Sequence, residues 1–182
     1  METETLPPQL SDIIREFDSA TQRVANLERT YTEDRWQRKP GPDQWSAIEC
    51  IQHLNLSNEQ MLPRIRESMR LLSKSAHQNK YHLDLIGWLL VKVLSSKSPF
   101  SKSKTSAPFL PVKGLNVQDV LKQFRSLQQD IIRAIHDSDG LPLDAGKVES
   151  AFNSRVKYNI YSAFRALAVH EHRHLDQAER TV

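Results

Sequence analysis

The chain has 182 residues, a length that suits one domain with its own hydrophobic core. Only 5 residues are glycine and 26% are charged, so the composition favours a soluble, mainly helical protein over a turn-rich β fold. The 25 basic and 22 acidic residues are interleaved along the sequence, and a net charge of +3 is too small to indicate a nucleic-acid-binding protein.

Two long amphipathic helices are predicted in the N-terminal half. Apolar residues recur at helical spacing over about 10–31, which predicts the first helix. Residues 32–45 contain two prolines and a glycine, so we expect a connection there rather than a helix or strand. The second helix is predicted over 46–74. It opens with Ser46 and Glu49 at the spacing of a capping box, in which each side chain accepts a backbone N–H of the other.

The next segment, residues 82–94, is predicted as a shorter helix, with a buried hairpin arm as the alternative, and is followed by a long irregular connection. Its apolar run contains Lys92 and is about half the length that a membrane-spanning helix needs, so we expect no stable membrane insertion. The strongest helical period lies over 116–137. Residues 141–156 have no clear period and are expected to form a loop, and the last helix is predicted over 157–179.

These elements predict an all-α fold. Four long amphipathic helices with no convincing strand pattern are typical of a four-helix bundle, here with a long connection between the second and third long helices. No internal repeat is visible, so we expect residues 1–182 to form a single domain.

The last predicted helix contains "VHEHRHLDQ", residues 169–177, with histidines at every second position. On a helix, His170 and His174 continue the apolar stripe, whereas His172 points to the outer face. Two imidazoles one turn apart can converge on one metal ion at roughly 2.0–2.2 Å. The pair could equally be core histidines that are hydrogen-bonded to their neighbours.

A third ligand would have to come from another helix. His77 and His82 lie in a polar connection, and His136 lies at a helix C-terminus, where a positive charge is favourable. His53 lies two turns into the second helix, but off its strongest apolar stripe. From the residues alone, His53 is more simply explained as a residue on the flank of that helix.

Two segments carry a resemblance to a known family. "DQWSAIECIQHL", residues 43–54, and "AVHEHRHLDQ", residues 168–177, resemble the two signature segments of the DinB/YfiT-like superfamily of bacterial metal-dependent proteins. In that family a Trp-Ser segment opens the second helix and leads to a histidine, and the last helix carries H-x-x-R-H-x-x-Q. The matching positions here are Trp45, Ser46, His53, His170, Arg173, His174 and Gln177.

The resemblance implies that His53, His170 and His174 are metal ligands on a four-helix scaffold, with water in the remaining positions. It implies one divalent transition metal ion, for which zinc or nickel is our first expectation. Iron and manganese also accept such ligands. Dimers are frequent in the family, so a homodimer is expected.

The resemblance also limits the reaction. We expect a small-molecule substrate and either a hydrolase or a transferase that depends on a low-molecular-weight thiol, because a bound divalent ion acidifies water and also holds a thiol as its thiolate. The alternative is a non-catalytic metal-binding or stress-related helical bundle. A third interpretation has residues 81–106 docking on a membrane surface or a partner through Trp88 and the lysines.

The remaining residues near these motifs are weaker candidates. Glu49 could be a general base beside His53, although its place in the capping box already explains it. Gln177 could orient a ligand or a water molecule. Arg173 is expected to form a salt bridge, and Trp45 to pack at the entrance of the second helix.

Cysteine usage and the N-terminus bear on the compartment. Cys50 is the single cysteine, so no internal disulfide forms, and we expect it in the core. The first ten residues have neither a basic region nor an apolar run of the kind found in secretory signals. A cytoplasmic protein is therefore predicted.

Overall fold

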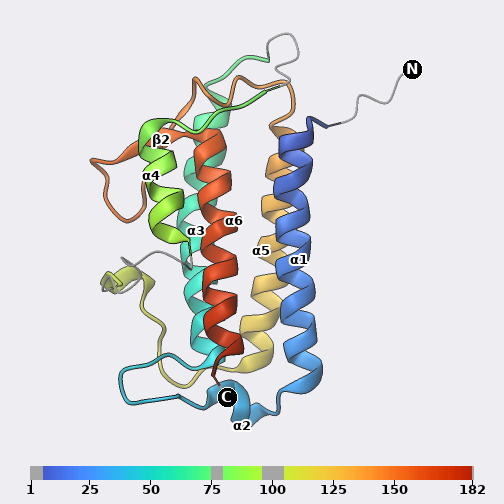
Figure 1. Cartoon of the computed structure of the whole chain (residues 1–182), viewed down its shortest axis with the longest axis vertical. Helices are drawn as coiled ribbons and strands as arrows, with labels where there is room; N and C mark the ends of the chain where they lie inside the picture. The colour runs from blue at the N-terminus through green and yellow to red at the C-terminus, as the bar shows by residue number, and fades with distance from the viewer. Residues whose placement is uncertain (1–5, 75–79, 96–104, 182) are drawn as a thin grey trace.

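The computed structural model of the chain describes residues 6–74, 80–95 and 105–181. Within them, four long helices lie side by side along the longest axis of the molecule (Figure 1). These helices are α1 (Pro8–Thr30), α3 (Ala47–Arg70), α5 (Val117–Asp137) and α6 (Ile160–Glu179). The predicted all-α fold is confirmed. His77 and most of the lysine-rich run that follows residue 95 lie outside the described residues.

The helices begin where the sequence provides a cap. Ser46 Oγ accepts the Glu49 N–H at 3.4 Å while Glu49 Oε2 accepts the Ser46 N–H at 2.8 Å, which is the predicted capping box at the start of α3. Asn116 caps α5 and Asn159 caps α6 in the same way, through their side-chain oxygens. These caps satisfy backbone N–H groups that have no partner within the helix.

The order of the helices explains the long connection. In Figure 1, α1 and α6 run in one direction, and α3 and α5 run in the other. Consecutive antiparallel helices need only a short loop, whereas the parallel pair α3 and α5 requires the chain to return along the whole length of the bundle. The return path contains α4 (Leu85–Leu94) and the short 3₁₀ helix η1 (Ala107–Phe109).

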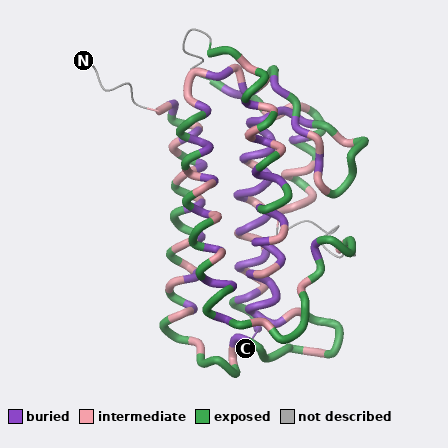
Figure 2. The backbone as a smooth tube through the Cα atoms, turned by 180° about the vertical axis from the view of Figure 1, so that it is seen from behind, coloured by how far each residue is buried: buried purple, intermediate pink, exposed green. Residues whose placement is uncertain are grey.

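Apolar side chains fill the two ends of the bundle. One cluster of buried residues includes Ile13, Phe17, Ile65, Ile131 and Phe164, and the other includes Val24, Ile51, Leu54, Phe124 and Leu175. Figure 2 shows buried residues along the inward-facing sides of the long helices and exposed residues on their outer sides. This is the pattern expected for amphipathic helices around a common core.

Besides η1, two short elements occur where the sequence predicted none. Helix α2 (Glu33–Gln37) lies in the first connection, where the Thr32 side chain accepts the Arg35 N–H. Strand β1 (Lys147–Glu149) lies in the predicted loop and pairs antiparallel with β2 (Lys157–Asn159). Three-residue strands are too short to produce a visible alternation, so the sequence pattern missed them.

Some predicted helix ends differ from the observed ones. The last helix begins at Ile160 rather than at residue 157, because residues 157–159 pair with β1. Helix α4 begins at Leu85 rather than at residue 82, because Asp84 Oδ1 accepts the Gly87 N–H at 2.8 Å and caps it. Helix α3 ends at Arg70, a few residues before the predicted end.

Helix α4 lies against the outside of α6. A Cβ atom at Gly87 would collide with the Ser162 side chain, so glycine is required at this close contact between the two helices. None of the helices in the described ranges combines the length and the apolar character that crossing a membrane would take.

Candidate metal centre

Three histidines from two helices meet near the middle of the bundle. His53 lies on α3, and His170 and His174 lie one turn apart on α6. Their side chains are 2%, 6% and 8% exposed, respectively, and they offer nitrogen atoms that all lie within 4.8 Å of one another. The placement of His53 on the flank of its helix is therefore wrong, because α6 and η1 cover that side of α3.

Hydrogen bonds determine which nitrogen of His53 and which nitrogen of His174 points toward the other histidines. His53 Nδ1 lies 2.8 Å from the carbonyl oxygen of Phe109, and His174 Nδ1 lies 3.2 Å from Gln177 Oε1. Both oxygens only accept, so each Nδ1 carries the hydrogen and donates it. Nε2 of His53 and of His174 then presents a lone pair, which is the arrangement found in metal-binding histidines.

The distance between two of the rings fits a shared ion. His53 Nε2 lies 3.1 Å from His170 Nε2. Two nitrogens bound tetrahedrally to zinc at the usual bond length lie about 3.3 Å apart, so this pair needs little movement to bind one ion. A hydrogen bond donated by His170 gives the same distance, as in the alternative of core histidines. The third ring, with its Nε2 lone pair, gives the group three nitrogen donors that could hold one ion.

Burial keeps the three imidazoles neutral. It lowers the pKa of His53 below the usual value, lowers that of His170 well below it, and lowers that of His174 to about 3. Repulsion from neighbouring histidines lowers the pKa of His170 and His174 further, and the Arg173 guanidinium lowers all three. A neutral imidazole is the form that binds a metal ion, so no proton has to be displaced near pH 7.

Aromatic rings surround the histidines. The centroid of the Trp45 ring lies 4.8 Å from that of His53 and 5.9 Å from that of His174. Trp45 therefore contacts the histidine group itself, in addition to lying at the predicted helix entrance. The Phe152 ring stacks on that of Phe109 with a centroid separation of 4.1 Å. It also makes an edge-to-face contact with the His170 ring, with a centroid separation of 6.3 Å. Phe152 is 49% exposed, so this part of the surroundings borders solvent. These rings cover part of the three-histidine group.

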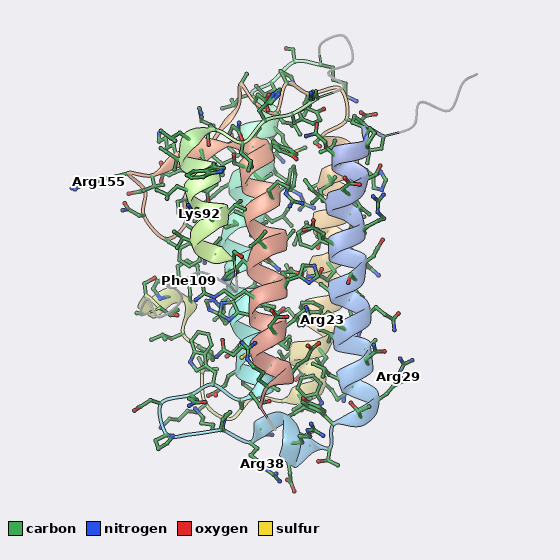
Figure 3. All side chains as sticks on the ribbon, viewed as in Figure 1. Arg23, Arg29, Arg38, Lys92, Phe109 and Arg155 are labelled. Atoms are coloured by element: carbon green, nitrogen blue, oxygen red, sulfur yellow. The ribbon has the colours of Figure 1, made fainter. Side chains whose placement is uncertain are left out.

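Histidines outside the group lie elsewhere. His172 is half-buried on the other side of α6, where Nδ1 lies 3.1 Å from Arg23 of α1. Figure 3 shows Phe109 and Arg23 on opposite sides of α6. The outward, solvent-facing direction predicted for His172 is therefore only partly right, because His172 is half-buried and packs against Arg23 of α1. His82 and His136 are exposed. The sequence pattern therefore separated the inward histidines correctly.

The two weak catalytic candidates have different surroundings. Both carboxylate oxygens of Glu49 have partners, since Oε2 accepts the Ser46 N–H and Oε1 lies 2.7 Å from Lys39 Nζ. Gln177 orients His174 through the hydrogen bond to Nδ1. Arg173 is half-buried beside the group and donates to the Val93 carbonyl at 3.5 Å. Cys50 is buried in the core, and burial raises the pKa of its thiol to about 12.

Sequence reasoning missed four residues next to the group. Phe109 contributes its backbone carbonyl from a connection whose residues show no pattern, so no signal pointed to it. Glu171, the residue after His170, forms a buried hydrogen-bonded cluster with Asn58 and Gln128. Burial raises the pKa of Glu171 to about 7, although the two amide groups oppose this. The sequence did contain a signal for this cluster, because Glu171 is a glutamate on the apolar stripe of the last helix.

Comparison with known families gives one match. The family model described as the DinB superfamily matches residues 16–178, which includes all three histidines of the group and both signature segments. No curated protein matches the chain.

Proposed function

The chain belongs to the DinB superfamily, and we propose that it is a metal-dependent enzyme that binds one divalent transition metal ion through His53, His170 and His174. The observation that carries this proposal is the convergence of three buried, neutral imidazoles, two of which have their Nδ1–H groups already engaged by oxygen atoms. Imidazole ligands suit zinc, nickel and iron, and zinc or nickel is the first expectation. Manganese is the least favoured, because it prefers oxygen ligands.

Within this site each residue has a defined task. The Phe109 carbonyl and Gln177 hold the rings of His53 and His174 in one orientation, and Trp45 packs against both rings. Three neutral ligands leave the full charge of a divalent ion uncompensated, so the bound ion would supply a strong attraction for an anionic group of a substrate. Arg173 adds a second positive charge beside the histidines.

We propose a low-molecular-weight-thiol-dependent transfer as the reaction class. A bound divalent ion can acidify water by itself, but metal-dependent hydrolases usually add a carboxylate or another base that moves protons during the reaction. Glu49 is engaged by Ser46 and Lys39, and Glu171 is fully buried and hydrogen-bonded to two amides. A thiol that binds as its thiolate needs no such base during the transfer, because it loses its proton on binding. The site therefore supports thiol chemistry better than hydrolysis.

The metal site is tested by elemental analysis of tag-free protein and by divalent-ion titration of His170→Ala. We expect about one transition metal ion per chain and a loss of affinity of more than about 100-fold in the variant, because one of three ligands is removed. His172→Ala is the matched control, since it removes a histidine of the same helix from the other side, and it keeps the affinity. Metal-free protein, or equal affinity in both variants, would refute the proposal.

The reaction is tested by a screen of the metal-loaded protein. Small thiols offered with electrophilic acceptors should show metal-dependent turnover that His170→Ala abolishes. Turnover only with esters or amides would identify a hydrolase, and no turnover with either set would favour a non-catalytic metal-binding bundle. A homodimer and a cytoplasmic location stay predictions, and light scattering of the purified protein tests the first of them.

A further inference from the structure

A second buried polar group lies in the core, and one of its members, Glu171, directly follows His170 in the sequence. Glu171 of α6 and Asn58 of α3 are 0% exposed, and Gln128 of α5 is 1% exposed. Glu171 Oε1 accepts hydrogen bonds from Asn58 Nδ2 at 2.8 Å and from Gln128 Nε2 at 2.7 Å. One carboxyl oxygen thus joins three of the four bundle helices.

Stability alone does not account for this group. Burying a carboxyl group and two amides costs free energy that their hydrogen bonds only partly return. Apolar side chains of similar size fill both ends of the same bundle, and replacement of buried polar groups by such residues is often neutral or stabilising. The position of these polar residues therefore indicates a specific role.

The group lies where the two ligand-bearing helices meet. Glu171 is the residue after His170, and Asn58 is five residues after His53 on α3. The Asn58–Glu171 hydrogen bond links the same two helices, α3 and α6, whose His53 and His170 nitrogens lie 3.1 Å apart. Gln128 of α5 donates a second hydrogen bond to the same carboxyl oxygen.

Small rotations of α6 would disturb the metal ligands. Side-chain tips lie about 5–6 Å from a helix axis, so a rotation of roughly 20° moves a tip by about 2 Å. Metal–nitrogen distances tolerate deviations of only about 0.2 Å. Apolar packing is non-directional and allows such rotations more readily than hydrogen bonds that require a particular direction.

We propose that Glu171, held by Asn58 and Gln128, is a positioning residue that fixes the rotation of α6 relative to α3 and so keeps His170 opposite His53. This inference rests on the proposed metal binding. Glu171 acts through the backbone of α6 and through the two amides, and it does not itself contact the ion. Its effect should appear in the affinity and geometry of the site, beyond its effect on folding.

Two substitutions separate positioning from simple packing. Glu171→Leu has a similar size but removes the acceptor and leaves two buried amides without it. Glu171→Gln keeps an acceptor oxygen, and its amide group can donate to Asn58 Oδ1 or Gln128 Oε1, which have no partner at present. The leucine variant should lose the positioning, and the glutamine variant should retain it.

The test is a Co²⁺ titration of metal-free protein followed by the ligand-field absorption spectrum, which reports coordination geometry. We expect Glu171→Leu to bind Co²⁺ about 10–100-fold more weakly with an altered spectrum, as is typical when groups that orient metal ligands are removed. Glu171→Gln should keep the affinity within a few-fold and keep the spectrum. Ile135→Ala, a core truncation at the far end of the bundle, is the control that lowers stability without changing either readout.

The inference is overturned if folded Glu171→Leu binds Co²⁺ with the affinity and spectrum of the wild type, or if Ile135→Ala weakens binding equally. Should Glu171→Leu not fold, Asn58→Ala replaces it, because this variant removes only the α3 donor; unchanged binding then overturns the inference. A wild-type protein that binds no Co²⁺ would refute the proposed metal site, and with it this role of Glu171. That outcome is distinct from a wild type that binds and a variant that binds equally well.

Discussion

The ends of the four-helix bundle and its middle are packed from different kinds of side chain. At both ends, aliphatic and aromatic residues from all four helices fill the core. Between them lies a polar layer, composed of His53, Asn58, Gln128, His170, Glu171 and His174. Helix α1 contributes to both apolar ends but carries none of these polar residues, so the other three long helices build the polar layer.

The difference separates stability from function. Burial of apolar surface at the ends supplies the driving force for folding, whereas each polar group in the middle costs free energy unless it is hydrogen-bonded. The middle layer should therefore set metal binding and contribute little to stability, and the ends should do the reverse. Each of the following changes tests one side of this contrast.

Phe17→Ala should have the largest effect on stability. Phe17 is fully buried on α1, and removal of its ring should lower the free energy of unfolding by about 3–5 kcal/mol. The folded fraction should keep its metal affinity, because α1 carries no proposed ligand. Urea denaturation together with Co²⁺ titration measures both quantities. A large loss of affinity in folded protein would show that the ends and the middle are coupled.

Metal binding should stabilise the fold through the middle layer. At an ion concentration 100-fold above Kd, the free energy of unfolding should rise by about 2.7 kcal/mol, because only the folded chain brings the three histidines together. Urea denaturation with and without Zn²⁺ measures this rise. His172→Ala should show the full rise and His53→Ala none. An equal rise in both variants would contradict the proposed ligand set.

Gln177→Ala should weaken metal binding while leaving the fold nearly unchanged. The side chain is half-buried near the end of α6, and its contact is the hydrogen bond that orients His174. Loss of such an orienting bond typically costs about 10–100-fold in affinity. Competitive titration with a chelator measures the change. An affinity within twofold of wild type would mean that packing against Trp45 is enough to orient His174.

Asp84→Asn should have the smallest effect, because it lies outside the core. Burial would raise the pKa of Asp84, but Lys147 and the N–H groups of Gly87 and Asn159 outweigh burial and hold the pKa below its usual value. Asparagine can still cap α4 through Oδ1, but its amide group replaces Oδ2, which accepts the Asn159 N–H and pairs with Lys147. The substitution should therefore cost about 1 kcal/mol.

The pH dependence of this effect has a defined sign. A carboxyl group with a depressed pKa stabilises the fold above its ordinary pKa, and this contribution disappears as the pH falls through the folded-state value. The difference between wild type and Asp84→Asn should therefore be constant from neutral pH down to about 4 and vanish in more acidic solution. Chemical denaturation of both proteins at a series of pH values measures it. A difference that persists at low pH would assign the effect to the cap instead of the ion pair.

Much of the fold follows from local patterns in the sequence. The long helices follow from apolar residues at helical spacing, and the start of α3 follows from Ser46 and Glu49 alone. Helical phase also divided the three histidines of α6 correctly, because residues four apart share a face whatever surrounds the helix. These properties involve residues within one or two turns, so no knowledge of distant contacts is needed.

The position of His53 could not be predicted from local sequence patterns. Periodicity placed His53 on the flank of its helix, and the family resemblance was needed to nominate it. Only the packed structure buries it, because η1 returns 56 residues later and presents the Phe109 carbonyl to Nδ1. The strand that delays the start of α6 likewise depends on pairing with β1.

The sequence by itself determined the helices, their caps and the inward direction of His170 and His174. The tertiary structure decided which residues those histidines meet: His53 from α3, and the amides of Asn58 and Gln128 beside Glu171. The physical reason is that a helix fixes the relative directions of its own side chains through local backbone hydrogen bonds. The face that packs against it depends on how distant segments bury their apolar surfaces together.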